Sequence, residues 1–363
     1  MKKVLFTATV DSHILHFHIP FLKLFKEKGY EVHVATNGDE EIPYCDKKHV
    51  ISFERSPFKI NNLKAIKQLK KVIDNEKFDI IHCHTPMGSV VTRLAAIKAR
   101  KNGTRVIYTA HGFHFYKGAP LINWLMFYPI EKWLSRYTDT LITINEEDYQ
   151  LAKKKFKKTN VEYVPGVGID PKKFDIKMSD KEKDALRKEI GVKKSDFVLS
   201  CVARLDKNKN QGFLISVLEN LIQEHSNIHL LLVGPDEYNG IYHKMVKDKK
   251  LQDNVHFLGN RDDIPEILEI SNIVVSASSR EGLPVNIIEA FASGVPVVAT
   301  HNRGHDEIIV ENKNGLFASN NPFDFANKII YIKNNISKFK FLNVDKFLLD
   351  NIIIKMKKIY KLV

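Results

Sequence analysis

Two glutamates lie eight residues apart in the segment SSREGLPVNIIEAFASGVPVVAT, residues 278–300. The Gly-Leu-Pro turn at 282–284 predicts the start of a helix and Gly-Val-Pro at 294–296 its end, between two strand-like runs. Glu281 is then expected in the loop after a strand, and Glu289 about two turns into the helix. Because a carboxylate accepts several hydrogen bonds, the pair is placed to hold the two ends of a polar ligand with adjacent hydroxyl groups.

A second constellation lies in VARLDKNKNQG, residues 202–212, where Arg204 and Lys209 are five residues apart between a predicted strand and the next helix. A planar guanidinium and a flexible ammonium beside a helix start suit a diphosphate, because backbone N–H groups also favour anions there. Alone, the two cations would read equally well as surface charges of a polar loop. The glutamate segment downstream favours the binding interpretation.

Histidines gather in TATVDSHILHFHIP, residues 7–20, which contains His13, His16 and His18, and again in His-Cys-His at 82–84. Three histidines are a ligand set that zinc accepts. However, no cysteine or carboxylate completes the set, and the His-Cys-His run lies on another predicted strand. We therefore expect no metal site.

The elements that carry these residues alternate between apolar, strand-like runs and amphipathic, helix-like ones. The alternation fills residues 1–170 and restarts in residues 196–340, while the charged stretch 171–195 shows little strand pattern and is expected to be a connector. This predicts an α/β protein with two Rossmann-like domains and a crevice at the carboxyl ends of the strands. Residues 341–363 have apolar positions at helical spacing, which predicts a helix that packs back on the body.

Composition narrows the class of protein. The 363 residues are 44% hydrophobic and contain no uninterrupted apolar run of about 18–20 residues, the length a membrane span needs. The first residues, MKKVLFTATVDSHI, read as a buried strand rather than a secretory signal, and the three cysteines have no pairing or metal spacing. We expect a soluble, cytoplasmic protein.

The net charge of +13 lies mostly in residues 1–170. Such an excess favours anionic lipid, nucleic acid or phosphorylated substrates, or it reflects a lysine-rich solvated surface. No nucleic-acid motif accompanies it. A dinucleotide oxidoreductase would carry G-x-G-x-x-G after its first strand, where this chain has TATVDSHI.

A helix with Lys64, Lys67, Lys70 and Lys71, together with INWLMFYPIEKWLSRY at 122–137, forms a basic and aromatic pair of segments. They are able to make a membrane-facing surface. For the aromatic segment, ordinary core is the favoured interpretation.

Three segments together resemble a known family: residues 278–300, VARLDKNKNQ at 202–211, and VPGVGIDPKKF at 164–174. They resemble the retaining family-4 glycosyltransferases of the GT-B fold, and the likeness covers essentially the whole chain. It looks closest to bacterial enzymes of exopolysaccharide or capsule assembly. The resemblance implies an activated nucleotide-sugar donor, held mainly by the C-terminal domain, and no cofactor.

The resemblance also implies residue roles. Arg204 and Lys209 would bind the diphosphate and Glu289 the ribose, while Glu281 would meet the donor hexose. His111, in YTAHGFHFYKG, matches a family histidine that faces the transferred sugar across the cleft. The other implied contacts are Gly282, Leu283, Pro284 and Arg261 on the donor side and His13, His18, His114 and Lys117 on the acceptor side. Many relatives have a glycine-rich loop after the first strand, and this chain has histidines there instead.

These features predict transfer of a hexose from a UDP-sugar, first of all UDP-N-acetylglucosamine or a close relative, with retention of configuration. The expected acceptor is a lipid-diphosphate-linked saccharide at the inner membrane face, and the expected catalysis needs no metal because cationic side chains stabilise the leaving diphosphate. Two alternatives stay open: a non-hydrolysing nucleotide-sugar 2-epimerase on the same architecture, and a non-catalytic nucleotide-sugar-binding protein.

Overall fold

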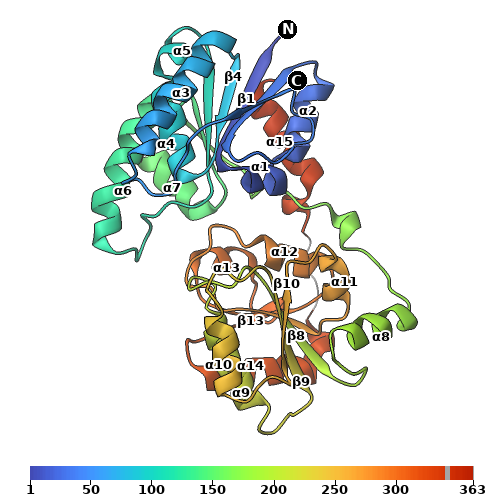
Figure 1. Ribbon diagram of the computed structural model, residues 1–363. Helices are drawn as coiled ribbons and strands as arrows, with labels where there is room; N and C mark the ends of the chain where they lie inside the picture. Colours follow the sequence, from blue (N-terminus) through green and yellow to red (C-terminus); the bar gives the residue numbers. More distant parts are fainter. Residues whose placement is uncertain (340–343, 363) are drawn as a thin grey trace. The chain divides into compact units, whose positions relative to one another are not determined.

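The computed structural model describes residues 1–339 and 344–362, which divide into two compact units. The first unit runs from Met1 to Val167 and takes up the chain again from Asp350, whereas the second runs from Gly168 to Leu349. Each unit is built on one parallel sheet with helices around it (Figure 1). Two Rossmann-like domains were the predicted fold, and this prediction is confirmed.

The first sheet has seven parallel strands in the order β3-β2-β1-β4-β5-β6-β7. The strands are β1 (Lys3–Val10), β2 (Glu31–Asn37), β3 (Lys47–Val50), β4 (Ile80–Cys83), β5 (Arg105–Ala110), β6 (Thr140–Thr143) and β7 (Asn160–Tyr163). The strand order reverses between β1 and β4. A parallel sheet of this kind opens a crevice at such a switch point, beyond the carboxyl ends of the strands.

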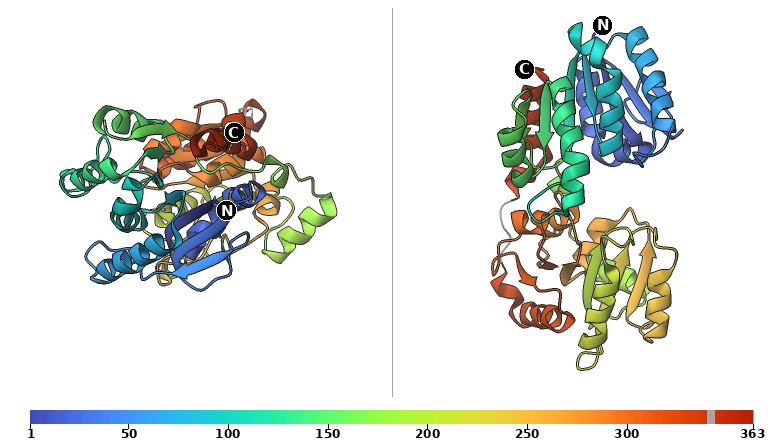
Figure 2. Two further views of the ribbon diagram at one scale, coloured as in Figure 1. Left: turned by 90° about the horizontal axis from the view of Figure 1, so that it is seen from above. Right: turned by 90° about the vertical axis from the view of Figure 1, so that its left-hand side faces the viewer.

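Helices cover both faces of the first sheet (Figures 1 and 2). They are α1 (Asp11–Phe17), α2 (Ile19–Glu27), α3 (Asn61–Glu76), α4 (Pro86–Ala95), α5 (Ile97–Lys101), α6 (Leu121–Leu134), η1 (Ser135–Tyr137), α7 (Glu146–Lys155) and α15 (Leu349–Tyr360). Side chains of a strand alternate between faces, so Val4 and Phe6 of β1 enter one hydrophobic core and Leu5 enters the other.

Helix α15 brings the C-terminal part of the chain back to the first unit. Its Ile352, Met356 and Tyr360 are buried in the core beside β1 and β2. The Tyr360 hydroxyl lies 2.8 Å from Nδ1 of His82, and the Arg105 guanidinium donates to the carbonyls of Ile359 and Tyr360. The expected C-terminal helix is thus a structural part of the N-terminal unit.

The second sheet has six parallel strands in the order β10-β9-β8-β11-β12-β13. The strands are β8 (Phe197–Val202), β9 (Ile228–Val233), β10 (Val255–Gly259), β11 (Ile273–Ser276), β12 (Val297–Thr300) and β13 (Gly315–Ala318). The helices are η2 (Pro171–Lys173), α8 (Asp180–Glu189), α9 (Gln211–Leu221), α10 (Ile241–Asp248), α11 (Ile264–Glu269), α12 (Val285–Ala292), α13 (Arg303–Ile308), α14 (Pro322–Asn335), η3 (Ile336–Lys338) and η4 (Asp345–Phe347). This order reverses between β8 and β11.

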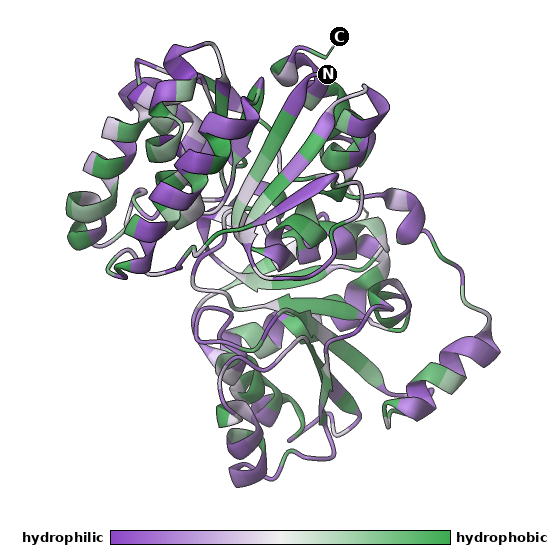
Figure 3. Cartoon of the chain, turned by 45° about the horizontal axis from the view of Figure 1, so that its top comes forward, coloured by the Kyte–Doolittle hydropathy of each residue, from purple (hydrophilic) through white to green (hydrophobic). Residues whose placement is uncertain are grey.

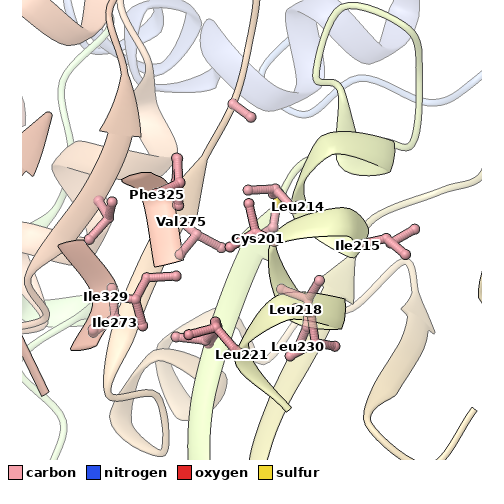
Figure 4. Packing of buried hydrophobic residues seen from close by; sticks show 14 of the residues in the cluster. Cys201, Leu214, Ile215, Leu218, Leu221, Leu230, Ile273, Val275, Phe325 and Ile329 are labelled. Carbon is pink, nitrogen blue, oxygen red and sulfur yellow. The ribbon is translucent and has the colours of Figure 1, made fainter. Parts of the chain in front are cut away.

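Buried aliphatic side chains hold the second unit together. Cys201 of β8 and Val275 of β11 meet Leu214 of α9 and Phe325 of α14 in one cluster (Figure 4). In Figure 3 the strands of the second sheet are mostly green, as expected of a sheet with both faces covered. No helix in the described part of the chain is long and apolar enough to cross a bilayer.

The stretch 171–195 is more than the connector that its charge suggested. It contains α8, which begins with a capping box in which the Ser179 side chain accepts from the backbone N–H of Glu182. Leu186 and Ile190 of this segment pack with Leu231 in a hydrophobic cluster of the second unit. The charge pattern concealed these apolar positions, which are enough to anchor a short helix.

Candidate functional site

Arg204, Lys209 and Glu281 lie in the loops at the switch point of the second sheet. The first two follow β8 and Glu281 follows β11, and these neighbouring strands are the ones between which the order reverses. The Lys209 ammonium lies 2.6 Å from Oε1 of Glu281, and both side chains are largely buried, with 19% and 13% of their surface exposed. Two segments more than seventy residues apart therefore converge where a sheet of this type binds its ligand.

Hydrogen bonds between the two loops hold this arrangement. The Asn208 side chain donates to the carbonyl of Arg280 at 3.0 Å, and the backbone N–H of Ser279 donates to the carbonyl of Asn208 at 2.8 Å. Asp206 accepts from the backbone N–H of Lys209 at 2.8 Å. Sequence analysis missed Asp206 and Asn208, although such residues commonly organise loops through their short polar side chains.

Arg204 is the more exposed cation of the site, with 47% of its side chain accessible. Its Nε donates to Asp206 at 2.7 Å, and Glu237 lies 3.4 Å from its terminal nitrogen. Gly234 permits the close packing beneath it, since a Cβ there would lie 2.3 Å from the carbonyl oxygen of Ala203. The guanidinium is thus oriented by carboxylates while it keeps an accessible face.

Glu289 lies on α12, half-buried, and burial raises the pKa of its carboxyl group to about 7. The helix begins at Val285 and not within the Gly-Leu-Pro turn, because Pro284 keeps an extended N-cap conformation. Glu289 is therefore little more than one turn into the helix, and the expected two turns were wrong. The Asn286 side chain donates to the carbonyl of Val202 at 2.9 Å and ties α12 to the end of β8.

Helix α13 packs directly against the Glu281 loop. A Cβ on Gly304 would lie 2.6 Å from the Cβ of Glu281 and 3.0 Å from Pro284, so only glycine fits without a shift. Asn302 caps α13 by accepting from the backbone N–H groups of Gly304 and His305. Its amide also donates to the carbonyl of Ser278 at 2.8 Å.

The remaining donor-side residues differ in accessibility. Gly282 is part of the same loop, and the Leu283 side chain is buried at its base. Arg261 donates from Nε and one terminal nitrogen to Asp263 and from the other terminal nitrogen to Glu189, at 2.6–2.8 Å. A nucleotide would have to displace a carboxylate to bind this guanidinium, so Arg261 is the weakest of the predicted donor contacts.

In the first unit, four histidines form a cluster that we call the four-histidine cluster: His13, His18, His84 and His111. Nε2 of His111 lies 3.2 Å from Nε2 of His13 and 3.5 Å from Nδ1 of His84, and the ring of His18 stacks on that of His84. The His-Cys-His run does lie on and just after another strand, β4, but His84 at its end still meets the first histidines. Strands β1, β4 and β5 are parallel neighbours, so the residues after them share one edge.

Burial lowers the pKa of every histidine in the cluster and brings that of His111 to about 4. These imidazoles are therefore neutral near pH 7. Each ring then has one N–H group and one nitrogen lone pair, so His111 is able to donate to a sugar oxygen. Its neutral state agrees with the role that the resemblance implies.

Of the predicted acceptor-side residues, His13 and His18 belong to the four-histidine cluster, whereas His114 and Lys117 lie in the segment after β5. His18 is only 2% exposed, so its side chain offers no accessible surface and we leave it out of the acceptor set. His114 packs on Phe127 of α6, and the backbone N–H of Lys117 donates to Glu147 at 2.9 Å. A separate hollow of about 840 Å³ in the first unit is lined by residues such as Arg105, Glu162 and Lys355, none of them a predicted site residue.

Known proteins resemble this chain along most of its length. Residues 3–145 match the family described as glycosyl transferase 4-like, and residues 182–340 match glycosyl transferases group 1. A Bacillus subtilis (strain 168) protein classed as the glycosyltransferase EpsD is 46% identical over 315 residues, which cover 86% of this chain and 82% of EpsD. The UDP-Gal:α-D-GlcNAc-diphosphoundecaprenol α-1,3-galactosyltransferase of Escherichia coli is 27% identical over 295 residues, 78% of this chain and 73% of that enzyme.

Among solved structures, HepE of Anabaena in complex with UDP-glucose superposes with a TM-score of 0.80 over the full length of both chains, at 21% identity. That identity supports a shared fold. Together with the EpsD match and the two family matches, it shows that the chain belongs to the family-4 glycosyltransferases of the GT-B fold.

Proposed function

We propose that this glycosyltransferase moves a hexose from a UDP-sugar to a lipid-diphosphate-linked saccharide, with retention of configuration, in the synthesis of a cell-surface polysaccharide. The observation that carries the donor assignment is the contact between Lys209 and Glu281 at the switch point of the second sheet, with Arg204 in the same loop as Lys209. Two cations and a carboxylate at that edge match the diphosphate and hydroxyl groups of a nucleotide sugar.

The names of similar proteins support the choice of substrates. The E. coli relative uses UDP-galactose and an acceptor on diphosphoundecaprenol, and HepE was crystallised with UDP-glucose. A Bacillus anthracis relative, 24% identical over 312 residues, is named N-acetyl-α-D-glucosaminyl L-malate synthase. We therefore place UDP-N-acetylglucosamine first among donors, with UDP-galactose and UDP-glucose as the comparisons.

In this proposal, catalysis consists of positioning the reactants and stabilising the departing diphosphate. Arg204 and Lys209 bear the charge, so this step needs no metal ion. Because an ammonium has three protons, Lys209 is able to keep its bond to Glu281 while it donates to a phosphate oxygen. Glu281 retains lone pairs for hexose hydroxyls, Glu289 accepts from the ribose, and His111 donates to the transferred sugar. The leaving phosphate itself accepts the proton of the incoming hydroxyl on the same face.

Thermal unfolding with UDP, GDP, ADP, CMP and NAD, without added metal, tests the donor site. We expect a shift with UDP alone that Arg204→Ala abolishes and that the exposed Arg136→Ala in the first unit leaves intact. No shift with any nucleoside diphosphate, or one with NAD alone, would contradict the assignment.

Turnover separates the proposed transferase from its alternatives. UDP-sugars are incubated with a diphospholipid-linked saccharide, and the anomeric configuration of the product is read by NMR. Conversion of the donor without any acceptor would instead identify a 2-epimerase, and nucleotide binding without turnover of any acceptor would identify a binding protein.

A further inference from the structure

The four-histidine cluster has the geometry of a metal site. One nitrogen from each of its rings lies within 4.8 Å of the ligand nitrogen of every other ring. The two separations centred on Nε2 of His111 are 3.2 and 3.5 Å. Tetrahedral zinc with Zn–N bonds of about 2.0–2.1 Å places its ligand nitrogens about 3.3–3.4 Å apart. Modest rotations of the rings would therefore bring the cluster to tetrahedral coordination.

Several buried nitrogens of the cluster have no partner in the protein, which favours a site for a ligand. Both ring nitrogens of His18 are buried and have no hydrogen-bond partner among the described residues. Nε2 of His84 has none either, although the nitrogen of that ring near His111 is Nδ1. A buried polar group without a partner costs free energy, and such groups are rare in folded proteins. The nearby His82 is different, because both of its ring nitrogens have a hydrogen-bond partner: the hydroxyls of Tyr360 and Thr109, each at 2.8 Å.

The surroundings select the class of ligand. Burial keeps all four rings neutral, so each has a lone pair free for coordination. An anion would find no cation here, since the described groups that affect these pKa values are other histidines. Imidazole nitrogens suit zinc, copper and nickel, whereas magnesium and calcium require oxygen ligands.

We propose that the four-histidine cluster binds one divalent transition-metal ion, Zn²⁺ first, at the switch point of the first sheet. The ion would join the segments that follow β1, β4 and β5, which are separated in sequence but adjacent in the sheet. It is distinct from the diphosphate site, which belongs to the second unit.

The metal also bears on the proposed role of His111, and this consequence rests on the proposed transferase function. Coordination through Nε2 leaves the proton on Nδ1, so the ion would fix the tautomer of the ring. His111 would then donate to the sugar from Nδ1. The two roles occupy different nitrogens and do not exclude each other.

The test uses the full chain, freed of any purification tag and of metal, and titrated with Co²⁺ as a spectroscopic substitute for zinc. We expect one equivalent to bind with the strong visible absorption of a tetrahedral site, and Zn²⁺ to displace it. Mg²⁺ and Ca²⁺ should not displace it. Metal analysis after gel filtration gives the stoichiometry independently of any transferase activity.

Two variants locate the ion. His13→Gln, at a partly exposed position, should weaken Co²⁺ binding at least about tenfold while circular dichroism shows an intact fold. His49→Gln is the matched control, because His33, His49 and Glu76 form the other group in the described residues with spacing suited to a metal. It should leave the cobalt spectrum unchanged, since Glu76 there is already paired with Lys3 and Lys47.

Three results would overturn the proposal: no bound metal after gel filtration, a weak octahedral spectrum in the unmodified protein, or a tetrahedral spectrum lost in His49→Gln and kept in His13→Gln. None of them depends on donor or acceptor, so the metal proposal and the transferase proposal fail separately.

Discussion

Glu289 shows how burial alone tunes a single residue of the site. Its pKa is raised to about 7 by desolvation, so near neutral pH the carboxyl group is only partly ionised. The ionised form is the better acceptor for a pair of ribose hydroxyls. If Glu289 holds the ribose as proposed, donor binding draws the proton off the carboxyl group and couples donor affinity to pH.

We predict that affinity for UDP-glucose rises between pH 6 and pH 8. Below the pKa of about 7 the protonated form dominates and each unit of pH costs up to about tenfold; above it the affinity levels off. Calorimetry at several pH values measures this. The ligand for this experiment is UDP-glucose and not UDP, because the terminal phosphate of UDP itself titrates near pH 6.

Glu289→Gln is the control for this coupling. The amide keeps the size of the side chain and one acceptor oxygen but does not titrate, so binding should be weaker and independent of pH over the same range. A pH dependence that persists in Glu289→Gln would assign the titration to another group.

At the scale of elements, α13 acts as a support for the Glu281 loop. Gly304→Ala would place a methyl group 2.6 Å from the Cβ of Glu281, so either α13 or the loop must shift. We predict a loss of about 1–3 kcal/mol in the free energy of unfolding from overpacking. We also predict a marked loss of donor affinity, because Glu281 and its partner Lys209 are displaced together.

Denaturant unfolding and UDP-glucose calorimetry on the same variant check both effects. Gly88→Ala in α4 of the first unit is the matched control, since its added methyl would lie 2.6 Å from Oγ1 of Thr85 and should cost stability while it spares the donor affinity. Normal donor affinity in Gly304→Ala would show that α13 does not position Glu281.

The segment 122–137, for which the sequence allowed either a membrane-facing surface or ordinary core, lies mostly in helix α6. Trp124, Phe127 and Tyr128 pack against the core, as an ordinary helix requires, while Leu121 and Leu125 are 80% and 73% exposed. Helix α3, which carries the lysine series, packs on α4, and so does α6. The aliphatic face of α6 is thus the part available to a lipid surface.

We predict that Leu121→Glu with Leu125→Glu weakens binding to anionic lipid vesicles severalfold and leaves donor binding unchanged. The change removes two exposed leucines and introduces two negative charges, which the anionic lipid repels. Vesicle sedimentation measures this, and Phe323→Glu, at a 67% exposed position in the second unit, is the control. Equal vesicle binding by the unmodified protein, the double leucine variant and Phe323→Glu would exclude α6 from the contact with lipid.

At the scale of the whole molecule, two units with separate cores should respond separately. Ile352→Ala in α15 removes a buried side chain from the first unit and should cost it about 2–5 kcal/mol. UDP-glucose should still raise the unfolding temperature of the second unit. Ile329→Ala, a matched truncation in the core of the second unit, should reverse this pattern.

Differential scanning calorimetry with and without UDP-glucose distinguishes the two transitions. A single transition that both substitutions lower equally would show that the units unfold together. That outcome would not affect the site assignments. It would mean that the two units unfold in one cooperative transition.

Much of the local structure follows from the sequence alone. The alternation of apolar and amphipathic runs predicted both sheets, because a strand covered on both faces needs a nearly continuous apolar run. The same pattern placed Arg204, Glu281 and His111 in loops after strands. The order of the strands within a sheet has no such periodic pattern in the sequence. The sequence therefore did not predict which other site residues lie close to Arg204, Glu281 and His111.

Only the tertiary structure decided which loops meet. The reversal between β8 and β11 joins Lys209 to Glu281, and the β1-β4-β5 order brings His84 and His111 to His13, although the three histidines follow three different strands. The pKa of Glu289 and the place of α15 on the first unit were decided there too. Residue types and their spacing determine what chemistry a loop is able to offer. Desolvation and the assembly of distant charges into one site depend on long-range packing, which a local pattern does not contain.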